Sequence, residues 1–97
     1  MRKITSEATA MFMSRRAWRK GNTEVFKWAD GTVELKLHGN AIATLNTWDV
    51  LRIRDAGWQT TTTKERLNGL PGVSISQKDF QWYLNGKPWD GGWTNVG

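Results

Sequence analysis

The chain has 97 residues, and its 14 Lys and Arg side chains outnumber its nine Asp and Glu side chains, giving a net charge of +5. Residues 1–20 hold six of the basic side chains and one acidic one, so residues 21–97 are neutral overall. The absence of cysteine excludes disulfides and thiolate metal sites and favours a reducing compartment. No apolar run approaches the roughly 20 residues that a membrane-spanning helix needs.

The length suits one domain over residues 1–97, with a single hydrophobic core. Its first part, residues 1–22, is predicted to be a basic helical segment. Thr5 or Ser6 serves as the N-cap, and Arg15 and Arg16 lie near the C-terminus, where the helix dipole favours cations.

Residues 23–55 switch to a period of two and predict a four-stranded meander. Asp30-Gly31 is the strongest two-residue hairpin signal, and Gly39-Asn40 and Asn46-Thr47 are read as two further turns. The N-terminal helix is expected to cover one face of this meander. The three registers place on that face Phe26, Trp28, Val33, Leu35, Leu37, Ile42, Leu51 and Ile53.

Residues 56–71 predict a loop rich in Trp and Thr followed by a helix of about two turns. Thr62 and Glu65 have the spacing of a capping box, Gly69 suits the position after the helix, and Pro71 prevents its continuation.

Residues 72–97 predict a hairpin and a tail. Val73–Gln77 and Phe80–Leu84 pair around a two-residue turn at Lys78-Asp79, and Asn85-Gly86 turns the chain again. The fold class is therefore α+β: an N-terminal helix packed on an antiparallel meander sheet, a short second helix and a C-terminal β-hairpin.

Catalytic signals are few, and we expect no enzyme, cofactor or metal. The single His38 lies beside a predicted turn, and a Ser or Thr nucleophile would have only this histidine as its base. Glu24 and Glu34 could share a sheet face, but each has a lysine nearby as a simpler partner.

The first candidate binding site is a run of cations around an indole, which suits phosphates and stacked bases or an acidic protein surface. The alternative is structural: basic residues suit a helix C-terminus, and the indole packs on the sheet. The run consists of Arg15, Arg16, Trp18, Arg19 and Lys20.

The second candidate is the start of the short helix, where Thr63, Lys64 and Arg66 could hold a phosphate or carboxylate. The alternative is ordinary capping, with Trp58 as a packing anchor. A third candidate is the tail, where Trp89 and Trp93 either mark an interface or fold back to close a sheet edge.

Three segments resemble a family of small proteins encoded by bacteriophages and mobile elements. The resemblance covers about residues 23–89 and implies an origin, with no catalytic residue to transfer. Its most distinctive segment is Gly57-Trp58-x-Thr60-x-Thr62-Thr63-Lys64-x-Arg66-Leu67-Asn68; the other two are Leu37-His38-Gly39-Asn40-x-Ile42-Ala43 and Gln81-Trp82-Tyr83-Leu84.

A phage origin implies action in the cytoplasm of a bacterial host. The leading hypothesis is a non-enzymatic inhibitor that binds a host complex handling nucleic acid, of the anti-CRISPR or anti-restriction kind. One alternative is a protein that binds DNA or RNA directly through the basic and aromatic surface. A weaker alternative is a minor structural protein of the virion.

Overall fold

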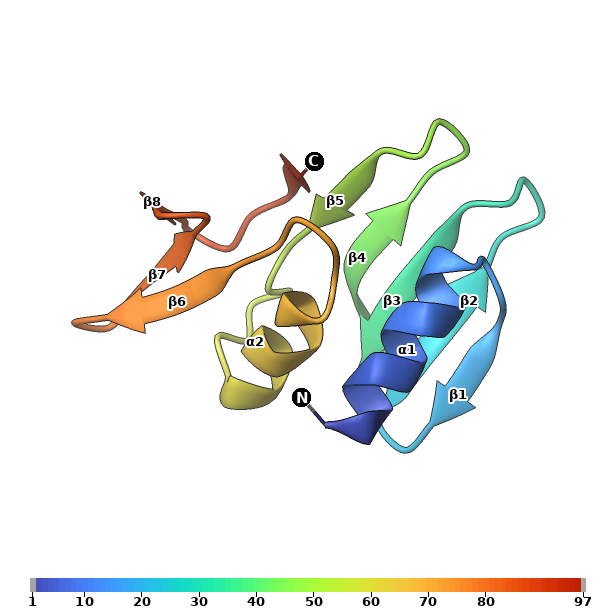
Figure 1. The fold of residues 1–97 in the computed structure, drawn as a ribbon, viewed down its shortest axis with the longest axis horizontal. Helices are drawn as coiled ribbons and strands as arrows, with labels where there is room; N and C mark the ends of the chain where they lie inside the picture. Colours follow the sequence, from blue (N-terminus) through green and yellow to red (C-terminus); the bar gives the residue numbers. More distant parts are fainter. Residues whose placement is uncertain (1, 97) are drawn as a thin grey trace.

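The structure, a computed structural model, describes residues 2–96. Within this range the chain forms two helices and nine strands (Figure 1). The helices are α1 (Lys3–Met13) and α2 (Thr61–Asn68). The strands are β1 (Trp18–Lys20), β2 (Thr23–Lys27), β3 (Val33–Leu37), β4 (Asn40–Leu45), β5 (Leu51–Ile53), β6 (Ile75–Lys78), β7 (Gln81–Leu84), β8 (Lys87–Pro88) and β9 (Thr94–Val96).

The strands form two antiparallel sheets, which confirms the α+β fold class. The larger sheet has the order β1-β2-β3-β4-β5-β9, and the smaller one has the order β6-β7-β8. Helix α1 lies across β2 and β3, and α2 contacts β4 and β6 (Figure 1). Neither helix of the described range is long and apolar enough to cross a membrane.

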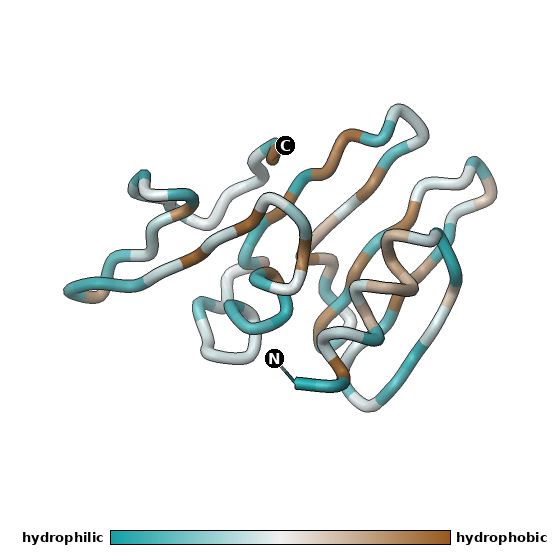
Figure 2. The backbone as a smooth tube through the Cα atoms, in the orientation of Figure 1, coloured by the Kyte–Doolittle hydropathy of each residue, from teal (hydrophilic) through white to brown (hydrophobic). Residues whose placement is uncertain are grey.

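One face of the large sheet, the inner face, joins the helices and the small sheet in a single hydrophobic core. Hydrophobic positions alternate with hydrophilic ones along the strands (Figure 2), as expected for a sheet covered on one face. Six predicted core residues are buried: Val33, Leu35, Leu37, Ile42, Leu51 and Ile53.

The side chains of strand β2 lie on the opposite faces of the sheet to those predicted. Phe26 and Trp28 therefore do not enter this core. The loop has three residues rather than two, with Lys27 opposite Val33 and the Trp28 N–H donating to the Thr32 carbonyl. Gly31, at φ 98°, takes the left-handed position that such loops require. A one-residue slip turns every side chain of a strand to the other face.

A β-bulge in strand β4 places Ile42 in the core, as predicted, although the turn before it differs. The turn after β3 is His38-Gly39 rather than Gly39-Asn40, because Leu37 pairs with Asn40. The register then shifts by one residue, so that Ile42 and Ala43 are both buried. The bulge therefore compensates for the shifted turn.

The loop between β4 and β5 also has three residues rather than the predicted turn at Asn46-Thr47. The Asn46 N–H donates to the Val50 carbonyl, and Asp49 takes the left-handed position at φ 61°. Leu45 consequently lies opposite Leu51, and the core face of β5 is preserved.

The N-terminal helix is shorter than predicted: it ends at Met13, and β1 begins at Trp18. The N-cap is Arg2, which makes no side-chain capping hydrogen bond. Thr5, a predicted cap, is instead fully buried inside the first turns. The run of cations begins just after this helix, where the Arg15 and Arg16 N–H groups donate to the Phe12 and Met11 carbonyls, and it continues into β1 rather than into further helix.

Helix α2 is confirmed, but its N-cap differs from the predicted one. The N-cap is Thr60, whose hydroxyl accepts a hydrogen bond from the Thr63 N–H at 3.1 Å, rather than Thr62. Gly69 directly follows the helix, as predicted, and its φ of −74° is one that any residue adopts.

The small sheet buries the predicted face, but β6 and β7 pair in a different register from the predicted one. Ile75 lies opposite Leu84 rather than Trp82, and the turn is Asp79-Phe80. The shift is two residues, so the same side chains stay on the buried face.

The tail folds back, which settles the alternative that the sequence left open. Strand β9 pairs with β5, and Trp89 is buried with its indole N–H 2.9 Å from the Thr94 hydroxyl. Trp93 lies on the opposite side of the sheet and is partly exposed.

Gly69→Ala should destabilise the fold, because a Cβ at this position would lie 2.6 Å from Cγ2 of Thr5 and 2.8 Å from Oγ1 of Thr9. Such overpacking typically lowers the free energy of unfolding by about 1–3 kcal/mol. Urea unfolding monitored by circular dichroism measures the loss, with Gly72→Ala as a strained but uncrowded comparison at φ 75°. Unchanged stability of Gly69→Ala would contradict the close approach of α1 and α2.

Candidate functional site

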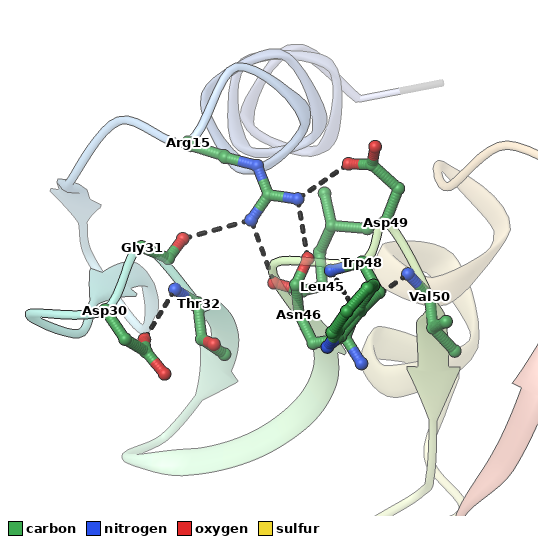
Figure 3. A network of polar contacts seen from close by, with 9 residues as sticks. All are labelled: Arg15, Asp30, Gly31, Thr32, Leu45, Asn46, Trp48, Asp49 and Val50. Carbon is green, nitrogen blue, oxygen red and sulfur yellow. Dashed lines mark hydrogen bonds and ion pairs between the residues drawn. The ribbon is translucent and has the colours of Figure 1, made fainter.

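Arg15, the first residue of the predicted binding run, fastens two hairpin loops together (Figure 3). Its Nη1 atom donates to the carbonyls of Gly31 and Leu45 at 3.0 and 3.2 Å. Its Nη2 atom lies 2.7 Å from both the Asn46 carbonyl and the Asp49 carboxylate. The guanidinium is thus committed to the loops that follow β2 and β4, and its role is structural.

The other members of the run lie on or beside the edge strand β1. Trp18 packs against the core, as the structural alternative predicts, and Lys20 is 3.5 Å from the Glu7 carboxylate. Arg16 and Arg19 are exposed, and neither forms an ion pair within residues 2–96. Charged side chains on an edge strand also discourage pairing with another chain. Binding by this run stays a prediction that rests on Arg16 and Arg19.

Arg66, from the second candidate site, is buried with only 3% of its side chain exposed. Its Nε donates to the Thr23 hydroxyl at 3.1 Å, and its Nη1 donates to the Thr5 hydroxyl at 2.8 Å. The Thr5 hydroxyl in turn donates to the Glu65 carboxylate at 2.7 Å. Burial lowers the pKa of the Arg66 guanidinium from its ordinary value, yet arginine remains charged in proteins.

The remaining residues of this site also have partners within the fold. The Thr63 N–H and hydroxyl both contact the Thr60 hydroxyl, and the Lys64 ammonium lies 3.5 Å from the Gln77 amide oxygen. Asn68 exchanges two hydrogen bonds with the backbone of Ile75, which attaches α2 to β6. The predicted anion site is therefore mostly scaffold.

A cavity of about 480 Å³ lies between the β3–β4 turn and the start of α2. Its lining combines Leu37 and Ile42 with the polar His38 and Asp55. Trp58 stands at this cavity with 62% of its surface exposed, so it is not the packing anchor of the structural alternative. Within residues 2–96 no three His, Cys, Asp or Glu side chains are grouped closely enough to hold a metal ion.

Sequence reasoning missed a cluster on the outer face of the large sheet, opposite the core. There the guanidinium carbons of Arg54 and Arg52 lie 4.6 and 5.3 Å from the ring centre of Trp93. Arg52 lies in β5, Arg54 directly follows that strand and Trp93 directly precedes β9, so no local motif connects them. Only the register between the two strands brings them together.

Arg15→Ala should lower the free energy of unfolding by about 1–3 kcal/mol, because hydrogen bonds to a charged group are among the stronger ones. Arg15→Lys should lower the free energy of unfolding by most of the same amount, since an ammonium lacks the planar array of donors that reaches both loops. Arg16→Ala removes the same charge one residue away and serves as the matched control in urea unfolding. Equal effects of Arg15→Ala and Arg16→Ala would contradict the fastening role.

The Thr5 hydroxyl holds the pKa of Glu65 below its ordinary value of 4.5. A carboxyl group with a lowered pKa stabilises the folded state above its unfolded pKa, and this contribution disappears as the pH falls through the folded value. Glu65→Gln should therefore weaken the fold at neutral pH and reduce the further loss of stability below pH 4.5. Part of the acid-induced loss of stability should remain in this variant, because the pKa of Asp30 is also lowered by its hydrogen bonds to Thr32. Thermal unfolding from pH 7 to pH 3 measures the difference, and identical acid slopes would count against the Glu65 contribution.

A model of the Kyanoviridae Gp96 protein family matches residues 1–95. No curated protein and no solved structure matches the chain. The family match confirms the phage part of the resemblance, while the Gly57–Asn68 segment as its signature stays a prediction. Because the match spans nearly the whole chain, this protein belongs to the Kyanoviridae Gp96 family of phage proteins.

Proposed function

We propose that this protein is a non-enzymatic phage accessory protein that binds a host complex handling nucleic acid and inhibits it. An anti-CRISPR or anti-restriction role in the host cytoplasm fits this description. The observation that carries the proposal is the tip of the β6–β7 hairpin, where an aromatic side chain stands in solvent on a strained backbone.

The tip consists of Asp79 and Phe80, which both have positive φ, 52° and 67°. Turns of this kind favour Asn-Gly, because left-handed backbone costs about 1–2 kcal/mol for other residues. The next turn of the same sheet, Asn85-Gly86, has φ values of 51° and 86° and follows this preference. The two turns thus differ in chemistry although their conformations match.

Phe80 is 95% exposed, and its hairpin extends to one end of the molecule (Figure 1). A strained position that carries a large exposed ring is unfavourable for the isolated fold, and such outliers cluster at functional sites. Aromatic side chains that enter a partner's pocket dominate the energy of many protein interfaces. We therefore assign Phe80 as an anchor for a protein partner.

Two other loops present exposed indoles, Trp48 at 85% and Trp58 at 62%. Large exposed aromatic side chains are typical of interaction sites. Their positions on separate loops support a partner that contacts more than the hairpin tip. Membership of a phage family supports a host target.

Phe80→Gly should leave the stability unchanged or raise the melting temperature by a few degrees, because glycine adopts positive φ without strain. The same change should abolish the retention of host protein on the immobilised chain. Retention is measured by mass spectrometry of proteins captured from a nuclease-treated host lysate. Phe80→Leu keeps an apolar side chain on the same backbone and serves as the matched control with partial retention.

Two results would overturn this proposal: no host protein retained by the unmodified chain, or full retention by Phe80→Gly. Host protein that is captured only without nuclease would favour a nucleic-acid bridge. Stoichiometric recovery of the protein from purified virions would favour the structural alternative.

A further inference from the structure

The outer face of the large sheet carries a continuous band of side chains that neither α1 nor α2 covers. Both helices contribute to the core on the inner face, where every buried aliphatic side chain of β2, β3 and β5 lies. Residues paired across antiparallel strands share a face, so the register defines the band directly. One row across the sheet consists of Phe26, Glu34, Thr44, Arg52 and Asn95.

One end of this band is a cationic and aromatic cluster whose arginines form no ion pair within residues 2–96. Arg52 and Arg54 both lie over the Trp93 ring, and the Arg54 Nε donates to the Ala41 carbonyl at 2.8 Å. Within residues 2–96, neither guanidinium has a carboxylate within 4.0 Å. Asp55 and Asp90 line the same hollow as Arg54 and Trp93, and each accepts a hydrogen bond from a glycine N–H of its own loop.

The other end of the band is a second aromatic pair. The rings of Phe26 and Trp28 meet edge to face at 5.1 Å, and the Lys36 ammonium lies 4.6 Å from the Phe26 ring centre. Half of the Trp28 side chain is exposed. Here Glu34 lies 4.0 Å from Lys36, so this end is close to neutral.

We propose that this outer face binds single-stranded nucleic acid. Unstacked bases stack on aromatic rings and on guanidinium planes, and the forked donors of arginine match phosphate oxygens. Phe26 and Arg52 are three strand spacings apart, about 14 Å, which accommodates several nucleotides along the row. A duplex keeps its base faces stacked internally and cannot use these rings.

The charge pattern favours a polyanion over an acidic protein. Arg52 and Arg54, which form no ion pair within residues 2–96, both lie over an indole, and guanidinium groups in such a setting can contact planar bases as well as phosphates. The inference is independent of the proposed host target, since it concerns the purified chain alone.

Fluorescence anisotropy with labelled dT15 and rU15 and with a labelled 15-base-pair DNA duplex tests the proposal over a series of NaCl concentrations. The single strands should bind more tightly than the duplex, with affinity falling as salt rises. Arg52→Ala/Arg54→Ala should weaken single-strand binding at least tenfold and make the slope of log K against log salt shallower by about 1.4, or 0.7 per lost phosphate contact.

The matched control is Lys78→Ala/Lys87→Ala, which removes the same charge from exposed positions of the small sheet and should change the affinity less than threefold. Arg52→Lys/Arg54→Lys keeps the charge and loses the planar stack, so it should weaken binding while preserving most of the salt slope. Circular dichroism establishes that each variant is folded. Absence of single-strand binding at 50 mM NaCl would overturn the proposal, as would equal losses in the two alanine variants or preferential binding of the duplex.

Discussion

The buried guanidinium of Arg66 joins three parts of the chain that lie far apart in sequence. From α2 it donates to Thr5 of α1 and to Thr23 of β2, and Thr5 links it to Glu65. A buried charge is tolerated only when its donors are satisfied and a counter-charge is near, so these neighbours are not interchangeable. The position of α2 against the sheet depends on this network.

The same network explains why the most distinctive segment of the sequence is scaffold. Thr60 begins α2, Arg66 attaches it to α1 and β2, and Asn68 attaches it to β6. The surfaces for which binding is proposed lie away from this network, at the hairpin tip around Phe80 and on the outer face around Trp93. Function is thus proposed for parts of the molecule whose side chains the fold does not need.

The buried faces of β3 and of the β6–β7 hairpin were predictable from alternation, although the turns that follow β3 and β6 are shifted by one residue from the predicted ones. The register of β2 was not, because two-residue and three-residue loops both accommodate Asp30-Gly31 and differ by one position. Packing decides between them: Val25 and Thr23 fit under α1, and the Thr23 hydroxyl receives Arg66. The bulky Phe26 is consequently placed outside.

The site was harder to predict because its contacts are long-range. Spacing places Arg15 next to Arg16, yet only the folded loops offer Arg15 the carbonyls of residues 31, 45 and 46. Likewise, Trp93 meets Arg52 and Arg54 through strand pairing across about 40 residues of chain. A sequence pattern reports neighbours along the chain, whereas these contacts depend on topology.

Strand β9 has a further consequence for the order in which the molecule is assembled during translation. Until Thr94–Val96 leave the ribosome, β5 is an unpaired edge and Trp93 has no sheet to lie on. The first five strands of the meander can pair locally and early, since each hairpin spans few residues. The outer face is therefore completed only when β9 pairs with β5, which brings Trp93 to Arg52 and Arg54.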